Sequence, residues 1–436
     1  MNYIKDDIKN IPIYYFNTPQ FKTTSISLAF TLKLSKNNYL YGQMLSRMLS
    51  KKTKKYNSPE KFADYLSDLY DSKISVECYG SGEILTIMFR VIFLNRKFCE
   101  GLDIEKEAIQ VLEEVVMNPY LINENGVLSF DPEDLEIEKR SMINNIADIY
   151  NNKMLYAYVK LLHLMYKDTP TEILLADDKE AINKIFADDL YTFYVEMLKN
   201  SEKYYIVMGN ISNEQLKKDL LRLSNNIKEG VNLKLLPIDS SKRKQDFNLA
   251  FEETIDEVQT SQSVISMGFF VDTYLYETDY PSILVANGMF GGYFNSALFQ
   301  IIREEYGLAY SISSSYNALN GSVVVVAGID QSNYPLCKKL ILDVLKKYQN
   351  INEDDKTLDM FNKIKKSLIS DLQQAEDSRY NQLLELKTKL DFKDNYYDTS
   401  LLIKKINDVS IDDVKNSFKK FKLSNVYFLK GNLENN

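Results

Sequence analysis

The chain repeats one order of sequence patterns in its two halves, and this repeat limits the possible folds more than any other feature. An apolar pair followed by two aspartates occurs in residues 182–190 and again in residues 406–414. A short apolar stretch ending in Gly-Asn follows each copy, in residues 205–211 and 427–433. The copies lie about 220 residues apart, which is the size of a whole domain rather than of a solenoid repeat. The pattern therefore predicts a duplicated domain.

Strand-like segments open the two halves in a similar way. Residues 25–34 alternate between apolar and polar side chains with period two, and residues 264–271 are rich in β-branched and aromatic residues. Further strands and long helical patterns follow in the same order, with strands expected at 73–79, 84–92, 309–315 and 322–329 and helices at 134–166 and 357–390. We therefore expect an α+β fold of two homologous domains, each a mostly antiparallel sheet covered by helices.

A polar segment without sustained periodicity separates the halves. Residues 236–259 contain Pro237 and the polar run 240–245, a composition that is typical of a connecting linker. The predicted domains are therefore residues 1–235 and residues 260–436.

Net charge and apolar content exclude several classes of function. The 436 residues carry a formal net charge of −8, so the phosphate backbone of a nucleic acid would be repelled on average. The most basic local run, Lys51, Lys52, Lys54 and Lys55, is expected to be a solvated helix end. The longest apolar run, residues 323–329, is far shorter than the ~20 residues that cross a bilayer, and the N-terminal sequence does not resemble a signal peptide. We expect a cytoplasmic protein that binds neither nucleic acid nor a membrane.

The few cysteine and histidine residues restrict the possible chemistry. Cys78, Cys99 and Cys337 are too widely spaced for a disulfide framework or a CxxC metal motif. His163 is the only histidine, and its apolar surroundings predict a packed helix residue. A Ser/His/Asp or Cys/His catalytic set would have to use it. A carboxylate-only magnesium site stays open as an alternative, although no clustered acidic motif supports it.

One long motif carries the strongest functional signal. A glycine-rich turn at residues 288–292 leads into a helix with apolar residues at 298, 299, 301 and 302, and Arg303–Glu–Glu–Tyr–Gly307–Leu–Ala–Tyr310–Ser follows. The Gly-Lys-Ser/Thr that cradles phosphate is missing, so the turn is not a P-loop. The motif resembles the second-half signature of the pitrilysin/insulinase family of zinc peptidases, L-F-x-x-x-R-E-x-x-G-L-A-Y-S. The resemblance extends over essentially the whole chain, including its two-fold repeat and its linker.

The resemblance implies a role in peptide binding. In that family two such domains enclose a peptide, and the arginine and the tyrosine of the motif help to bind it opposite the metal. These positions fall on Arg303 and Tyr310. The alternatives are a surface helix residue that pairs with an acid, for Arg303, and a half-buried strand residue, for Tyr310.

The same resemblance implies that the catalytic site has been lost. The family's inverted zinc motif, H-x-x-E-H, places two histidines one helical turn apart and a glutamate that activates a zinc-bound water. Alignment of the helix at residues 41–53 puts Gln43 and Arg47 at the histidine positions, Ser46 at the glutamate position and, to within one residue, Asn145 at the distal ligand position. None of these side chains substitutes for the original residue, because glutamine is a poor zinc ligand, serine alone is not a base, and arginine carries a permanent positive charge. We expect a chain that is not itself an enzyme and holds no metal.

Within the family, the chain is most similar to the bacterial group described as elongation factor P 5-aminopentanol modification-associated, YfmF-type. The similarity rests on residues 287–294, 328–334 and 153–157. Members of this group lack the zinc motif and are commonly paired with a sister protein that has it. The resemblance implies a non-catalytic, substrate-binding subunit of a heterodimer, with zinc in a catalytically competent partner and a peptide as substrate.

In isolation the chain could form a homodimer. Two other functions of the chain remain open at the level of sequence. It could be a structural or assembly protein of the same fold with no role in proteolysis. It could also be an active hydrolase with an unrecognised site. A link to elongation factor P modification rests on the group's label alone, since no residue chemistry bears on it.

Overall fold

The computed structural model describes residues 3–175, 178–210, 213–227, 251–351, 353–392 and 396–432. The chain divides into two compact units, which consist of residues 1–146 with 176–237 and of residues 147–175 with 238–436.

The division differs in two places from the order of the sequence. Residues 147–175, which lie within the first predicted domain, group with the second unit. The segment expected to be a linker, 236–259, lies outside the described residues as far as residue 250. The end of that segment forms strand β9 (Glu252–Val258).

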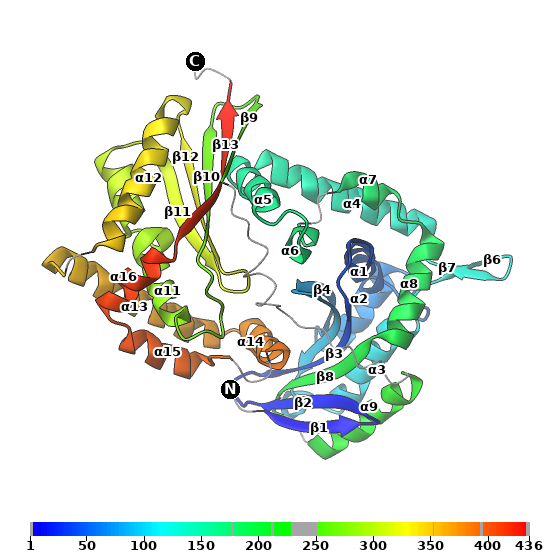
Figure 1. Cartoon of the computed structure of the whole chain (residues 1–436). Helices are drawn as coiled ribbons and strands as arrows, with labels where there is room; N and C mark the ends of the chain where they lie inside the picture. The colour runs from blue at the N-terminus through cyan, green and yellow to red at the C-terminus, as the bar shows by residue number, and fades with distance from the viewer. Residues whose placement is uncertain are drawn as a thin grey trace. The chain divides into compact units, whose positions relative to one another are not determined.

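The first unit is built on a six-stranded sheet with the strand order β1-β2-β8-β3-β5-β4 (Figure 1). All neighbouring strands are antiparallel except β2 and β8, which are parallel. The strands are β1 (Ile4–Ile8), β2 (Ile11–Asn17), β3 (Thr23–Lys33), β4 (Lys73–Ser81), β5 (Ile84–Leu94) and β8 (Glu202–Gly209). A separate hairpin consists of β6 (Ile122–Glu124) and β7 (Val127–Ser129). The helices are α1 (Lys36–Leu49), α2 (Pro59–Asp68), η1 (Arg96–Phe98), α3 (Ile104–Met117), α4 (Pro132–Asn151), α7 (Lys179–Asn183), α8 (Ala187–Asn200) and α9 (Asn213–Asn226).

The second unit contains a five-stranded sheet with the order β11-β12-β10-β13-β9 (Figure 1). Only β9 and β13 pair in parallel. Besides β9, the strands are β10 (Ser263–Phe270), β11 (Ala309–Asn317), β12 (Ser322–Ile329) and β13 (Lys422–Gly431). The helical segments are α5 (Lys153–Met165), α6 (Pro170–Ile173), α11 (Tyr280–Asn287), η2 (Gly288–Gly292), η3 (Phe299–Glu305), η4 (Gln331–Asn333), α12 (Tyr334–Gln349), α13 (Asp355–Glu376), α14 (Arg379–Asp391), α15 (Thr399–Asp408) and α16 (Ile411–Lys419).

The strands β10, β12 and β13 of the second sheet are covered on both faces. Its main core contains inward-facing residues of β10, β12 and β13 together with α11, α12, α13, α15 and α16. On the other face α5 packs directly on β10, where a Cβ atom on Gly268 would lie 2.2 Å from Met165 Sδ. Tyr166, just after α5, donates a hydrogen bond of 2.6 Å to Ser322 Oγ. This close packing explains why residues 147–175 group with the second unit.

The repeated double aspartate lies in the first turn of a helix in both units. Asp188 and Asp189 lie in the first turn of α8, where carboxylates are stabilised by the helix dipole. In the second unit Ser410 and Asp413 form a capping box at the start of α16. The predicted α+β class with mostly antiparallel sheets is confirmed.

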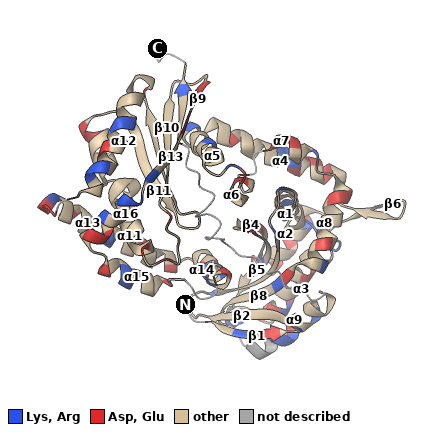
Figure 2. Cartoon of the chain, viewed as in Figure 1, with Lys and Arg blue, Asp and Glu red and all other residues tan. Residues whose placement is uncertain are grey.

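Figure 2 shows that charged residues lie mainly on the helices and that β10, β11 and β12 carry none. β10 and β12 are buried along nearly their whole length, as expected for strands with both faces covered, whereas several residues of β11 are exposed. Among the described residues, none of the helices combines the length and the apolar content that crossing a membrane requires.

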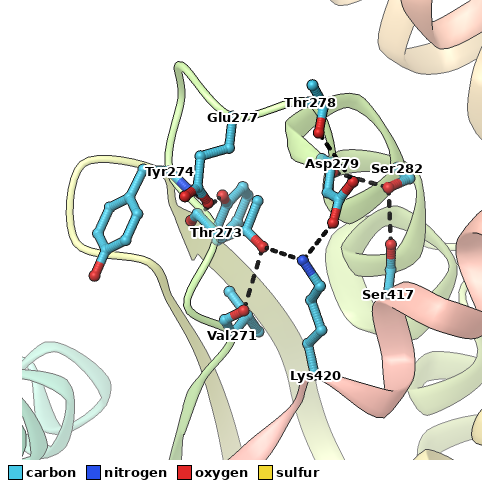
Figure 3. Close-up of polar contacts among 10 residues, drawn as sticks. Val271, Thr273, Tyr274, Glu277, Thr278, Asp279, Ser282, Ser417 and Lys420 are labelled. Carbon is cyan, nitrogen blue, oxygen red and sulfur yellow. Dashed lines mark hydrogen bonds and ion pairs between the residues drawn. The ribbon is translucent and has the colours of Figure 1, made fainter. Parts of the chain in front are cut away.

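Hydrogen bonds and an ion pair among polar side chains link the start of α11 to the end of α16 (Figure 3). The Lys420 ammonium contacts Thr273 Oγ1 at 3.1 Å and forms an ion pair with the Asp279 carboxylate. Ser417 Oγ donates to Ser282 Oγ at 2.9 Å, and Ser282 Oγ donates to the carbonyl oxygen of Asp279 at 2.8 Å. Because α11 runs directly into η2, these contacts also position the glycine-rich segment.

The buried ammonium group of Lys203 should make the stability of the protein increase as the pH rises above about 8. Lys203 in β8 is only 3% exposed, and its Nζ donates to the carbonyl oxygen of Ser201 at 2.8 Å. Burial lowers the pKa of this ammonium from 10.5 to about 8. The unfolded chain therefore binds more protons than the folded chain between about pH 8 and 10.5, and the lysine's cost to stability falls as the pH rises through that window.

We expect Lys203→Met to raise the free energy of unfolding by about 1–3 kcal/mol at pH 7, because a buried charge is removed. The gain should shrink as the pH rises to 10, where the wild-type lysine is neutral in the folded chain. Urea unfolding of both proteins at pH 7 and pH 10 measures this. An equal gain at both pH values would show that burial of the ammonium is not its cause.

Candidate functional site

Helix α1 holds the three positions that align with the zinc motif. It begins at Ser35, whose side chain accepts a hydrogen bond from the backbone N–H of Asn38, a standard N-cap. Gln43 Nε2 donates to the carbonyl oxygen of Cys78 at 3.4 Å. Ser46 Oγ donates back to the carbonyl oxygen of Gln43 at 2.7 Å. Both side chains are thus engaged with nearby backbone.

Helix α4 brings the predicted distal position next to α1. Arg47 Nη1 donates to Ser141 Oγ at 3.2 Å. With the Asn145 amide oriented so that its oxygen faces the guanidinium, Arg47 Nη2 donates to that oxygen at 2.7 Å. The structure therefore brings together Arg47 and Asn145, two of the four positions that the alignment assigns to the metal site.

The side chains at these positions do not fit a zinc ion. Zinc sites in proteins use thiolate, imidazole or carboxylate ligands, whereas Arg47 and Asn145 supply a permanent cation and an amide. Within the part of the chain that the structure describes, no group of three or more His, Cys, Asp or Glu side chains is arranged to hold a metal ion. No chemical step is therefore assigned to a metal in this chain.

Ion pairs join the end of α1 to α4 beside this contact. Lys51 pairs with Glu138, whose side chain is 5% exposed, and Lys52 pairs with Asp134. The Lys52 ammonium also lies 4.1 Å from the centroid of the Tyr120 ring. The expectation of a solvated helix end is therefore wrong for Lys52, because acids and an aromatic ring that are distant in sequence surround it.

A pocket of about 160 Å³ lies at the same helix ends. Its walls include the apolar side chains of Met48, Leu49, Pro119, Tyr120 and Phe130. The four charged residues that line it are the two lysines and two acids that pair with one another. Each charged side chain in the pocket wall is thus already paired with another one in the wall, so none is left to bind a polar ligand.

The second candidate region follows the glycine-rich segment of the other unit. Both η2 and η3 are π-helical, a rare geometry that often occurs at functional sites. Glycine is required at position 291, because a Cβ atom there would lie 2.9 Å from the backbone nitrogen of Ser314 in β11. Gly307 ends η3 with a φ of +61°, a conformation that favours glycine. The chain then enters β11.

Arg303 and Tyr310 lie on either side of this turn, and both are accessible. The Arg303 side chain is 40% exposed, with its Nε 3.8 Å from Glu304 Oε1 and its Cζ 4.7 Å from the centroid of the Phe299 ring. Tyr310 is 60% exposed and donates a hydrogen bond of 2.6 Å to Asp330 Oδ1. This bond to a carboxylate raises the pKa of the Tyr310 hydroxyl. The alternative of a half-buried strand residue is wrong for Tyr310.

Two features of this region were not anticipated from the sequence. Asp330 accepts the Tyr310 hydrogen bond, although it lies 20 positions further along the chain. Phe294 is 83% exposed, whereas the sequence shows only an aromatic residue after a pair of glycines. Neither the hydrogen bond to Asp330 nor the exposure of Phe294 can be predicted from the pattern of residues, because both depend on how η2, η3 and β11 pack.

Comparisons with known proteins place the chain among peptidase-like folds. Residues 184–364 match the family described as "Peptidase M16 inactive domain". The chain is 23% identical to the "Probable inactive metalloprotease YmfF" of Bacillus subtilis, over 99% of this chain and 98% of that protein. The chain resembles the inactive members of the M16 family. The resemblance to a non-catalytic zinc peptidase that the motifs predicted is confirmed.

Solved structures agree with this M16-like fold over the whole chain. A conserved protein from Enterococcus faecalis matches with a TM-score of 0.89 at 22% identity, with full coverage of both chains. The M16 inactive domain from Pseudomonas fluorescens matches with a TM-score of 0.77 at 15% identity, again with full coverage. The predicted architecture is therefore that of the M16 fold.

The aligned metal positions can be tested by restoring the family's ligands. We expect the quadruple variant Gln43→His, Ser46→Glu, Arg47→His and Asn145→Glu to bind about one zinc ion per chain, since it recreates the ligand set of the inverted motif. Metal content after dialysis against zinc, measured by atomic emission, reports the binding.

The matched control carries only Ser46→Glu and Asn145→Glu, which add charge without the two histidines. It should bind little zinc, as should the wild type. A folded quadruple variant that binds no more zinc than this control would show that the alignment of α1 or α4 is wrong.

Proposed function

We propose that this M16-like chain is the non-catalytic, peptide-binding subunit of a two-chain zinc peptidase. The partner would be an M16-type chain with an intact H-x-x-E-H motif, which would supply the zinc ion and its activated water. One contrast carries the proposal. Arg47 is engaged with Ser141 and Asn145 at the aligned metal position, while Arg303 and Tyr310 remain exposed.

The edge position of β11 supports peptide binding. Among the described residues, β11 is the outermost strand of the second sheet and pairs with β12 alone. An edge strand presents unpaired backbone N–H and C=O groups, and an extended peptide can add to it as a further strand. Ser311, Ser313 and Ser315 are exposed along β11, and such small side chains allow a second backbone to approach closely.

The side chains beside this edge suit the recognition of a peptide backbone. A guanidinium donates hydrogen bonds in a fixed planar arrangement and never loses its charge. The Tyr310 hydroxyl, already held by Asp330 at 2.6 Å, keeps two lone pairs that can accept a hydrogen bond from a peptide N–H. Arg303 and Tyr310 could therefore hold a peptide without any metal.

The need for a partner follows from the chemistry. Peptide hydrolysis by this family requires a zinc-bound water and a general base, and Gln43, Ser46 and Arg47 supply neither. A chain that keeps the peptide-binding residues would contribute to catalysis only if a second chain performs the cleavage. The relative YmfF carries the description of an inactive metalloprotease, which agrees with such a division of labour.

We expect the double variant Arg303→Ala and Tyr310→Phe to lower peptide cleavage by the complex at least about tenfold while leaving its assembly intact, because two contacts to the bound peptide are lost. Both side chains are exposed, so the chain should still fold. The readouts are kcat/KM of the reconstituted complex and its elution in size-exclusion chromatography. Arg222→Ala with Tyr380→Phe, also at exposed positions, is the matched control.

Two results would contradict the proposal. Unchanged cleavage by the assembled double variant would favour a structural or assembly role instead. A zinc-bearing partner that is fully active alone, and that neither binds this chain nor changes its cleavage in the chain's presence, would exclude a two-chain peptidase.

A further inference from the structure

The loop between η2 and η3 holds an aromatic ring in solvent. Phe294 is 83% exposed, the largest exposed fraction among the large apolar side chains of the described residues. Single exposed apolar residues are common on protein surfaces, so this exposure alone indicates no function. The exposure matters here because hydrogen bonds hold the backbone of the loop and because a second aromatic ring contacts Phe294.

The backbone around the exposed ring is fixed on both sides. Tyr293 Oη donates to Asp371 Oδ2 on α13 at 2.5 Å. The backbone nitrogen of Ser296 donates to the carbonyl oxygen of Tyr293 at 3.0 Å, and Gln300 Nε2 donates to the carbonyl oxygen of Asn295 at 3.2 Å. Hydrogen bonds on both sides of Phe294 therefore hold the loop that exposes its ring.

Three side chains form a continuous surface, which we call the aromatic platform: Phe294, Phe299 and Arg303. The rings of Phe294 and Phe299 meet edge to face, with centroids 5.6 Å apart and an interplanar angle of 83°. The guanidinium carbon of Arg303 lies 4.7 Å from the centroid of the Phe299 ring. Edge-to-face ring pairs and stacked guanidinium groups are both favourable arrangements, so the platform is ordered before anything binds.

The charge of the platform is available to a ligand. The ion pair that the structure gives Arg303 is with Glu304, at 3.8 Å between Nε and Oε1, and both side chains are largely exposed. Such a pair contributes little and is easily exchanged. The Nη groups are the part of a guanidinium that binds a carboxylate in the bidentate manner.

We propose that the aromatic platform is a specificity subsite for a peptide that carries an apolar side chain next to an Asp or Glu residue. The exposed Phe294 ring would receive the apolar side chain, and Arg303 would bind the neighbouring carboxylate. This inference rests on the proposed peptide-binding function, and it adds Phe294 as a residue that determines specificity. The segment η3, which carries Phe299 and Arg303, packs against β11, so a peptide paired with β11 would pass near it.

Charge complementarity favours an acidic residue at this position. The chain as a whole carries a net charge of −8, so it repels acidic peptides at long range. A preference for an acidic peptide must therefore come from a local cation such as Arg303. This makes the preference sensitive to a single substitution.

The test measures the affinity of the complex of this chain with its zinc-bearing partner, inactivated by a chelator, for three labelled peptides. These share one neutral sequence that contains Phe-Glu, Phe-Gln or Ala-Glu at its centre. We expect Phe294→Ala to weaken binding of the Phe-Glu peptide about 5–10-fold, the loss of one aromatic contact, with little change for Ala-Glu. Arg303→Gln should remove the preference for Phe-Glu over Phe-Gln. Phe186→Ala, another exposed phenylalanine with a nearby cation, is the matched control.

Three other outcomes would overturn the inference. If Phe294→Ala binds Phe-Glu within twofold of wild type while Arg303→Ala with Tyr310→Phe does not bind, the subsite is wrong and the peptide-binding function stands. If the wild type binds none of the peptides, both proposals fail. If Phe294→Ala weakens assembly with the partner but not peptide affinity, Phe294 belongs to a protein–protein contact instead.

Discussion

The contact of Arg47 with Ser141 and Asn145 is the interaction on which the functional account depends. A guanidinium keeps its positive charge at every pH a protein experiences, and a divalent cation cannot share its place without strong repulsion. Arg47 donates to both polar side chains of α4, at 3.2 Å and 2.7 Å. At the positions that align with the family's metal site, the contact between α1 and α4 is thus made by a permanent cation.

The second unit shows the opposite arrangement, in which the groups suited to a ligand stay open. Glycine at positions 291 and 307 allows η2 to approach β11 closely and the chain to turn between η3 and β11. Arg303 is left stacked on a ring rather than enclosed by acids. Tyr310 lies at the start of β11, the edge strand of this sheet within the described part of the chain. The cation at the aligned metal positions of one unit and the exposed Arg303 and Tyr310 of the other are the two observations from which the proposed peptide-binding subunit is argued.

Much of the fold could be predicted because it follows from local patterns. The alternation in residues 25–34 corresponds to β3, and the two double aspartates lie at the starts of α8 and α16. The strand β9 could not be predicted, because its sequence is mostly polar and it pairs only with β13 at the edge of the sheet. Likewise, nothing in residues 147–175 shows that α5 packs on β10, since that contact depends on the space above Gly268. For the site, the motif indicated Arg303 and Tyr310, but the hydrogen bond from Tyr310 to Asp330 and the exposure of Phe294 required the packed structure.

The most direct test of the central claim is amide hydrogen exchange of the purified chain, with an excess of chelator, in the presence and absence of an extended peptide. The account predicts that the peptide slows exchange of the β11 amides, residues 309–317, and that the chelator does not change this protection, because the peptide adds to an edge strand without a metal. Protection that appears only with zinc, or a peptide that leaves the β11 amides unchanged, would contradict it.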